Sequence, residues 1–189
     1  MNAYAELLNK DDCLLLLVDL QQSMLANCLA ADRIRNNASI LIDIARILDI
    51  PILLTEQNPR KLGTFLPELR AKVPNPAVFS KNQFGLFENE TIQQAIEAIG
   101  RKSIILAGIE AHICIFQTGT GAIRLGYRVH AVADAVSASS QMNLDIGLER
   151  LKRAGAVITS MEMAIFELLK LADTDEFRNV LPHIKKIVK

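Results

Sequence analysis

Residues 104–118 read IILAGIEAHICIFQT, a stretch that passes from apolar strand formers to a group of reactive side chains. Its first four residues have the aliphatic and β-branched character of a buried strand, and this run ends at Gly108. A carboxylate, an imidazole and a thiol follow at Glu110, His112 and Cys114. The segment 114–127 then has a helical pattern. The stretch therefore predicts a strand-to-helix junction that carries chemistry.

Short apolar runs alternate with longer amphipathic segments along the whole chain. The runs that indicate strands are 13–20, 52–55, 77–79, 103–107, 128–132 and 156–159. Apolar residues at helical spacing mark 31–50, 88–99, 144–154 and the tail 173–189. Strands that are apolar on both faces and separated by helices belong to a parallel sheet that is covered on each side. We expect a doubly wound, Rossmann-like α/β fold, with a mostly parallel six-stranded sheet and helices on both faces.

Length and composition favour one domain that spans residues 1–189, because half of the side chains are apolar and two ordinary domains need a longer chain. Lys plus Arg equals Asp plus Glu at 21 each, so no excess of positive charge indicates a nucleic acid or an anionic membrane as partner. A small molecule is the expected ligand. The sequence shows no signal peptide and has three cysteines at spacings unsuited to zinc, which predicts a cytoplasmic protein with free thiols.

Polar residues follow four of the predicted strands. Asp19 follows the first strand, Lys81 the third, the segment 110–114 the fourth and Asp134 the fifth. In an open parallel sheet, ligands bind beyond the carboxyl ends of the strands, near the point where the strand order reverses. We therefore expect all four to lie at one edge of the sheet.

An acid, an amine and a thiol at one edge predict acyl-transfer chemistry. A free cysteine is mostly protonated at neutral pH, so a nucleophilic thiol needs activation by a cation, a base or a helix N-terminus. Cys114 begins a predicted helix, Lys81 would hold the thiolate, and Asp19 would take the thiol proton and return it to a leaving amine. Cys13 and Cys28 are interpreted as core residues.

The region 56–76 contains four prolines and Gly63, and it is too long for a bare connection. A functional lid and a structural wrap over the core remain open alternatives.

With these residues identified, the chain resembles the isochorismatase-like cysteine hydrolase superfamily over nearly its whole length. The resemblance rests on Asp19-Leu20-Gln21 after the first strand, on Lys81 before an aromatic-rich turn, and on the element from Gly108 to Cys114. The stretches TEQNPRKLG, GIEAHICIFQT and LERLKRAGAVITS are most similar to the subgroup of isochorismatase domain-containing proteins.

The resemblance implies a catalytic triad with Cys114 as nucleophile, Asp19 as general base and acid, and Lys81 as the charge that stabilises the thiolate. It also implies a cis peptide between Ile109 and Glu110, which would turn the backbone N–H groups of Glu110 and Cys114 toward a developing oxyanion. Nicotinamidases of this superfamily hold a metal with histidines after the second strand, but residues 55–59 contain none. We therefore expect no metal, no cofactor and a substrate other than nicotinamide.

The presence of Cys114 separates this chain from isochorismatases that cleave a vinyl ether, which lack the cysteine. A small amide or related C–N bond is the expected target, cleaved through a thioester. The expected substrate-binding residues are Gln21, Gln57, Phe84, Glu110 and Gln117. Glu110 either contacts the substrate or caps the following helix, and His112 is expected to point away.

Two other function classes remain open. One is a noncatalytic, oligomeric small-molecule-binding protein of the same fold, and the other is a redox-active thiol protein with Cys13 or Cys28 as resolving partner. Convergence of Asp19, Lys81 and Cys114 in one pocket would favour catalysis, and its absence would favour binding. The resemblance also implies a homo-oligomer, in which the apolar segment 161–169 either forms an interface or packs on its own sheet.

Overall fold

A computed structural model describes residues 7–187. Its six strands form one sheet in the order β3-β2-β1-β4-β5-β6, and every neighbouring pair is parallel. The strands are β1 (Cys13–Val18), β2 (Ile52–Gln57), β3 (Ala77–Lys81), β4 (Ser103–Ile109), β5 (Arg128–Ser137) and β6 (Val157–Thr159). The predicted fold class is confirmed. The strand order reverses between β1 and β4, which places the switch point at the centre of the sheet.

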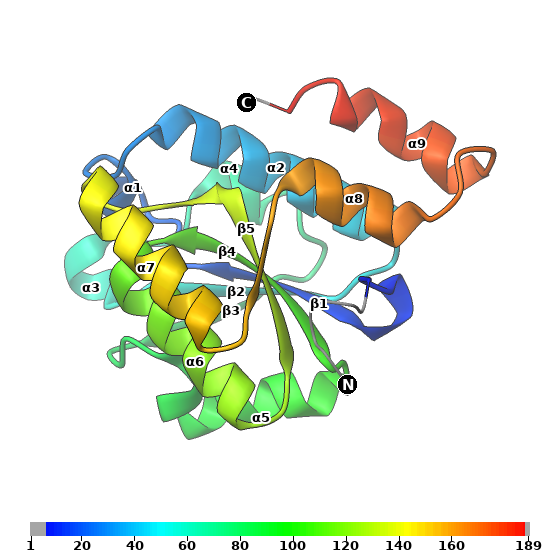
Figure 1. The fold of residues 1–189 in the computed structure, drawn as a ribbon. Helices are drawn as coiled ribbons and strands as arrows, with labels where there is room; N and C mark the ends of the chain where they lie inside the picture. The colour runs from blue at the N-terminus through cyan, green and yellow to red at the C-terminus, as the bar shows by residue number, and fades with distance from the viewer. Residues whose placement is uncertain (1–6, 188–189) are drawn as a thin grey trace.

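Helices cover both faces of this sheet (Figure 1). The longer ones are α2 (Ala31–Ile47), α5 (Glu90–Ile99), α6 (Phe116–Arg124), α7 (Gln141–Arg153), α8 (Met161–Leu169) and α9 (Asp175–Ile184). The short ones are η2 (Lys10–Asp12), α1 (Gln22–Leu25), α3 (Pro59–Leu62), α4 (Pro67–Arg70), η3 (Leu86–Glu88) and η4 (Ala111–Ile115). The predicted tail helix 173–189 corresponds to α9, and residues 188–189 of that prediction lie outside the described residues.

The central strand β1 shows why both faces must be covered, because all six of its residues are buried. Leu15 and Leu17 belong to a core shared with α2 and α8, whereas Leu14 and Leu16 belong to a second core shared with α5, α6 and α7. Alternate side chains of one strand thus supply both cores, as expected for a strand between two helical layers.

Four strands, β2, β3, β4 and β5, extend farther than their apolar runs. Parallel pairing continues from β2 to β3 as far as Gln57 and Lys81, so the ladder includes polar residues that end the strands. β5 reaches Ser137 through a register shift against β4 between Leu106 and Gly108. The apolar pattern did not show these extensions because several of the added residues are polar, although most of them are buried.

The region 56–76 folds into α3 and α4 after the end of β2. Its later part packs into the core through Phe65, Leu66 and Leu69, so that part is a structural wrap. The Gln21 side chain holds its middle by donating to the Gly63 carbonyl, and Gln21 also forms an isolated bridge with Phe65. Among residues 7–187, no helix has the length and apolar character needed to cross a membrane.

Candidate active site

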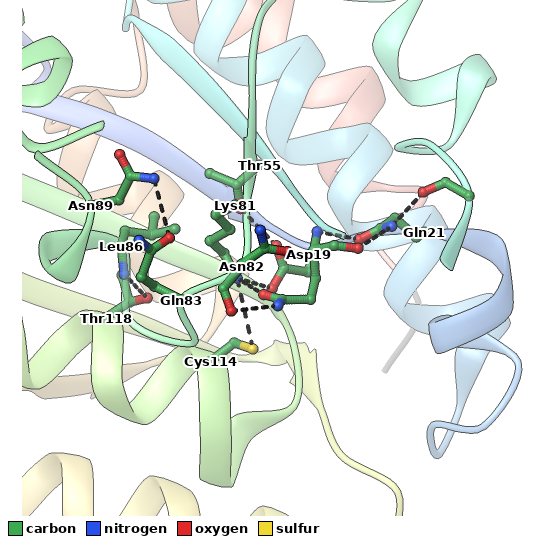
Figure 2. A network of polar contacts seen from close by, with 12 residues as sticks. Asp19, Gln21, Thr55, Lys81, Asn82, Gln83, Leu86, Asn89, Cys114 and Thr118 are labelled. Atoms are coloured by element: carbon green, nitrogen blue, oxygen red, sulfur yellow. Dashed lines mark hydrogen bonds and ion pairs between the residues drawn. The ribbon is translucent and has the colours of Figure 1, made fainter. Parts of the chain in front are cut away.

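Asp19, Lys81 and Cys114 meet beyond the carboxyl ends of β1, β3 and β4, and Figure 2 shows them side by side. Lys81 Nζ lies 2.6 Å from Asp19 Oδ2 and 3.9 Å from Cys114 Sγ. The three residues are 0%, 3% and 2% exposed for Asp19, Lys81 and Cys114, respectively. The structure therefore brings together the three residues that the sequence placed at one edge of the sheet.

Asp19 is the first residue after β1 and has a positive φ of 57°. This left-handed conformation, which Asp tolerates better than most residues, turns the chain sharply at the switch point. Thr55 Oγ1 donates to Asp19 Oδ1 at 2.9 Å, and the Asp19 N–H donates to the Thr55 carbonyl at 3.0 Å. Two contacts with the neighbouring strand thus hold the carboxylate in place. The sequence analysis did not identify Thr55, although a polar residue at a strand end beside Asp19 was a usable signal.

Lys81 is the last residue of β3, and its ammonium group has a second partner in Gln57 Oε1 at 2.6 Å. Gln57 Nε2 donates to the Asn82 carbonyl at 3.0 Å. The Gln57 backbone is held in turn by the Gln21 side chain, which accepts from Gln57 N–H at 2.6 Å and donates to the Gln57 carbonyl at 3.0 Å. Gln21 and Gln57 therefore fix the position of the buried amine.

Cys114 lies in η4, a π-helical turn between β4 and α6. Single π-helical turns are rare in proteins overall, but those that occur often lie at functional sites. The Glu110 carbonyl accepts from the N–H groups of Ile113 and Ile115, the two residues that flank Cys114 in sequence. Gly147 of α7 packs directly on this turn, since a Cβ there would lie 2.7 Å from the carbonyl atoms of Ala111. A helix packed at this distance restricts how the turn that carries the thiol can move.

Close approach of β1 and β4 explains the glycine that ends the predicted strand. A Cβ at Gly108 would lie 2.2 Å from the Val18 carbonyl oxygen, and Gly108 has a φ of 135°. Both observations require glycine at this position. The two strands at the switch point thereby bring Asp19 and the turn of Cys114 close together.

The Ile109–Glu110 peptide is trans, and none of the residues 7–187 has a cis peptide bond. The cis bond implied by the resemblance is therefore a wrong prediction for this structure. The chain changes direction through backbone torsions instead, with φ values of 135° at Gly108 and 61° at Glu110.

Burial raises the pKa of the Cys114 thiol to about 12, and the negative charge of Asp19 is the second cause. The positive charge of Lys81 acts in the opposite direction but does not outweigh these two effects. Lys81 is already paired with Asp19 at 2.6 Å, which limits its effect on the thiol. The raised pKa favours the protonated thiol, which has a carboxylate nearby.

A polar cavity of about 510 Å³ opens at Lys81. Its lining residues come from the segment after β2 and from the end of β3 and the turn that follows: Asn58, Pro59, Arg60, Ser80, Lys81, Asn82, Gln83 and Asn89. None of these side chains carries a carboxylate. The first part of the region 56–76 thus lines a cavity next to Lys81, whereas its later part packs on the core. Asp19 and Cys114 are not among the lining residues of this cavity.

Three expected substrate-binding residues remain. Phe84 lies in the loop after β3, Glu110 precedes the turn of Cys114, and Gln117 follows that turn in α6. Phe84 is 53% exposed, and Gln117 is exposed beside Gly85, where a Cβ would lie 3.2 Å from Gln117 Cβ. Glu110 occupies the N-cap position of η4 without making a side-chain capping hydrogen bond. Its Oε2 atom lies 3.4 Å from His112 Nδ1, so His112 is directed at Glu110.

Asp134 and Cys13 lie apart from the triad, and Cys28 contacts Glu110. Asp134 is inside β5, not beyond it, and its Oδ1 atom accepts from the Met161 N–H at 2.9 Å at the start of α8. Cys13 is buried at the opposite end of β1, and Cys28 lies 3.9 Å from Glu110 Oε1. All three cysteines are free, and burial raises the pKa of Cys13 to about 12 and that of Cys28 to about 11.

Comparison with known proteins gives one consistent result. The pattern of the isochorismatase domain matches residues 13–163. A secreted isochorismatase effector, Isc1 of Phytophthora sojae, is 35% identical over 158 residues, which cover 82% of this chain and 75% of that protein. Several other curated relatives carry the name isochorismatase domain-containing protein.

Two solved structures are similar to the whole fold. A structure described as the MAR1 ribonuclease of Caenorhabditis elegans has a TM-score of 0.90 and 32% identity, covering 95% of this chain and 93% of its own. The YcaC gene product of Escherichia coli, described as an octameric hydrolase of unknown specificity, has a TM-score of 0.91 and 26% identity, covering 96% and 91%. With a domain match over most of its length and relatives above 30% identity, the chain belongs to the isochorismatase family and has the hydrolase-like domain of that family.

Proposed function

We propose that the protein is a cysteine hydrolase that cleaves a small amide or related C–N bond through a thioester. One observation carries this proposal. A buried ammonium group, that of Lys81, lies 2.6 Å from the Asp19 carboxylate and 3.9 Å from the Cys114 sulfur at the topological switch point, and both partners are also buried. Burying an ion pair costs desolvation energy, and a cysteine beside it adds no evident stability. Catalysis gives this arrangement a purpose.

The raised pKa of Cys114 sets the order of proton transfer. The thiol enters the reaction protonated, so Asp19 takes its proton as Sγ attacks the substrate carbonyl. The new C–S bond produces a tetrahedral oxyanion, which collapses with cleavage of the C–N bond while Asp19 returns the proton to the leaving amine. Water then attacks the thioester, Asp19 accepts a proton from that water, and the sulfur leaves with this proton as the acid is released.

Lys81 orients the carboxylate and offsets the negative charge that develops on sulfur. It donates to Asp19 Oδ2 and contacts Cys114 Sγ, so a single ammonium group serves both partners. We propose the backbone N–H groups of Glu110 and Cys114 as oxyanion donors. In support, the Glu110 carbonyl accepts from the residues on either side of Cys114 and not from Cys114 itself. One such donor contributes about 3 to 4 kcal/mol to transition-state stabilisation.

Of the five expected substrate-binding residues, some would contact the substrate directly and others would act through a neighbouring residue. Gln21 acts through Gln57, because its amide is hydrogen-bonded to backbone groups of Gln57 and Gly63. Gln57 holds Lys81, whereas Phe84 and Gln117 would form a wall on the opposite side. Glu110 is proposed to accept a hydrogen bond from the substrate, since it does not cap the helix.

A noncatalytic binding protein is less well supported because the three side chains converge. A redox role for the thiols is also less well supported, since all three cysteines are free and Cys13 lies at the opposite end of β1 from the site. The ribonuclease name of the C. elegans neighbour motivates an RNA-cleavage control. We expect no cleavage, because side chains only 0 to 3% exposed are poorly accessible to a polynucleotide.

We further propose that the protein acts in the cytoplasm as a homo-oligomer, as the octameric E. coli neighbour suggests. On α8, Met161 and Ile165 pack in the core, and Met163 and Phe166 are exposed. The apolar segment 161–169 therefore packs on its own sheet through one face and leaves a smaller apolar surface for a partner. Light scattering of the purified protein measures the oligomer, and fractionation tests the location against the secretion of the Phytophthora relative.

A panel of small amides tests the hydrolase proposal. We expect ammonia or amine release by the unaltered protein, loss of turnover in Cys114→Ala, and full turnover in the matched control Cys28→Ala. Intact mass spectrometry during slow turnover should show an acyl adduct, and peptide mass spectrometry should locate it on the peptide that contains Cys114. Turnover that persists in Cys114→Ala would exclude the thioester route.

A further inference from the structure

Glu56 is a buried carboxylate that the proposed mechanism does not use. It lies in β2 between Thr55 and Gln57 and is 8% exposed. Its Oε2 atom accepts from the Phe65 N–H at 3.0 Å, and its Oε1 atom accepts from Ser80 Oγ at 2.8 Å. Both donors are uncharged, and no basic side chain within the described range 7–187 pairs with this carboxylate. A buried charge without a counter-ion costs desolvation energy, so its presence calls for a reason in the structure or in the chemistry.

The geometry of β2 separates Glu56 from the triad. Successive side chains of a strand point to opposite faces of the sheet. Thr55 contacts Asp19 and Gln57 contacts Lys81 on one face, so the Glu56 side chain points to the other face. Glu56 can therefore affect the triad only through the residues that it holds.

One route from Glu56 to the triad runs through the wrap. Phe65, whose N–H donates to Glu56, forms the isolated antiparallel bridge with Gln21. The Gln21 side chain accepts from the Gln57 N–H at 2.6 Å and donates to the Gln57 carbonyl at 3.0 Å. Gln57 Oε1 in turn accepts from Lys81 Nζ at 2.6 Å. A continuous set of contacts thus connects the carboxylate with the buried ammonium group.

A second route runs through β3. Glu56 is paired with Ser80 in the ladder, and the next pair is Gln57 with Lys81. β3 is an edge strand whose one neighbour in the sheet is β2, so the hydrogen bond from Ser80 Oγ adds a side-chain link to a strand with a single partner. The same carboxylate therefore holds both the wrap and the strand that carries the catalytic amine.

We propose that Glu56 is a positioning residue, which fixes Gln57 and Lys81 through the wrap and through β3. The inference rests on the proposed hydrolase function and adds a residue that does not touch the reacting atoms. Lys81 must stay close to both Asp19 and Cys114, and a shift of about 1 Å in a catalytic group can lower a rate about 100-fold. Loss of two contacts made by one carboxylate should produce a shift of this kind.

Two variants of Glu56 separate its contacts from its mere presence. Glu56→Ala removes both hydrogen bonds. Glu56→Gln keeps the shape, since its carbonyl can accept from the Phe65 N–H and its amide can donate to the hydroxyl of Ser80, which also accepts. With an amide from the substrate panel, we expect Glu56→Ala to lower kcat about 100-fold and to leave KM within about 3-fold, whereas Glu56→Gln should retain kcat within about 5-fold.

Asp12→Ala is the matched control for a purely structural effect. The Asp12 carboxylate also accepts from a backbone N–H and a serine hydroxyl, those of Lys102 at 3.2 Å and Ser103 at 3.1 Å, and it pairs with Arg128. It lies before β1, at the end of the sheet opposite the site. Asp12→Ala should lose stability but keep kcat within about 2-fold when both variants are assayed below their melting transitions. Equal losses of kcat in Asp12→Ala and Glu56→Ala would overturn the proposal.

Amide hydrogen exchange, followed by NMR, tests the coupling without a substrate. The Phe65 N–H donates to Glu56, whereas the Gln57 N–H donates to Gln21 and reports on the support of Lys81. Relative to the core amide of Leu16, Glu56→Ala should accelerate exchange at both positions at least about 10-fold, and Glu56→Gln should restore it. Acceleration at Phe65 alone would show that Glu56 holds only the wrap, which would contradict the proposal.

A further variant covers the case in which Glu56→Ala does not fold. Glu56→Asp is too short to reach both donors at once, and it should accelerate exchange at Gln57 and lower kcat about 10-fold. If exchange at Gln57 depends on Glu56 but no amide is hydrolysed, the positioning network stands and the hydrolase proposal fails. If amides are hydrolysed and the loss of Glu56 leaves kcat unchanged, the hydrolase proposal stands and the positioning role fails.

Discussion

Asp19→Asn should make Cys114 more reactive toward alkylating agents while it abolishes hydrolysis. Since Lys81 Nζ lies 2.6 Å from Asp19 Oδ2 and 3.9 Å from Cys114 Sγ, the carboxylate oxygen is at most 6.5 Å from the sulfur. With an effective dielectric constant of about 20, two unit charges at that distance interact by about 2.6 kcal/mol or more. This energy corresponds to roughly 1.9 pKa units. Removal of the negative charge should therefore lower the pKa of Cys114 from about 12 to roughly 10.

The assay is the iodoacetamide labelling rate of Cys114 at about pH 8.5, below both pKa values. A fall of roughly 1.9 units raises the thiolate fraction about 80-fold, and the lower basicity reduces the reactivity of each thiolate about 7-fold. The net expectation is labelling about 10-fold faster. Amide turnover should fall by about 10² to 10⁴, because the variant has no general base.

Two controls accompany this variant. Loss of one partner from a buried ion pair costs about 3 to 5 kcal/mol, so a melting curve must show that Asp19→Asn is folded. The double variant Asp19→Asn/Lys81→Met removes both charges and avoids an unpaired buried ammonium group. A folded Asp19→Asn protein whose Cys114 labels at the original rate or more slowly would refute the electrostatic argument.

Three further changes probe the support of the site and the core. Gly147→Ala should reduce turnover at least about 10-fold and lower the free energy of unfolding by about 1 to 3 kcal/mol, since the added Cβ lies 2.7 Å from backbone atoms. The matched control for activity and urea unfolding is Gly119→Ala, whose nearest contact is a leucine methyl at 2.6 Å and not backbone. Thr55→Val should cost about 1.5 to 3 kcal/mol in urea unfolding by removing the hydrogen bond to Asp19, and a cost near zero would show that this bond is dispensable. Burial lowers the pKa of His130, so the unfolded chain takes up a proton that the folded protein does not, and stability should fall by up to about 1.4 kcal/mol per pH unit as the pH drops below about 6.5. The same urea titration of His130→Leu should show a smaller dependence on pH, and an unchanged slope would assign the effect to other groups.

Much of the fold was predictable because burial on both faces leaves a simple pattern in the strands. The run 13–20 contains β1, and the run 103–107 lies within β4. The strand ends were less accessible, since the pairing of Gln57 with Lys81 depends on a neighbouring backbone. The same limit explains the wrong placement of Asp134. The apolar run 128–132 put this residue after the fifth strand, whereas it lies inside β5.

At the site, the convergence of Asp19, Lys81 and Cys114 followed from topology alone. The ionisation of the thiol did not, because it depends on a balance between burial, a carboxylate and an ammonium group that only coordinates define. Thr55 was missed because it acts through a hydrogen bond between two strands, which no sequence pattern records.

The central position of β1 has a consequence for biosynthesis. This strand leaves the ribosome before the other five strands of the sheet, yet one of its neighbours is β4, whose Ser103 pairs with Cys13. At about 5 to 20 residues per second, several seconds pass before that partner exists. During this interval a wholly apolar segment has one unpaired edge, which favours aggregation. The nascent chain should therefore depend on molecular chaperones, and depletion of chaperones should lower its soluble yield.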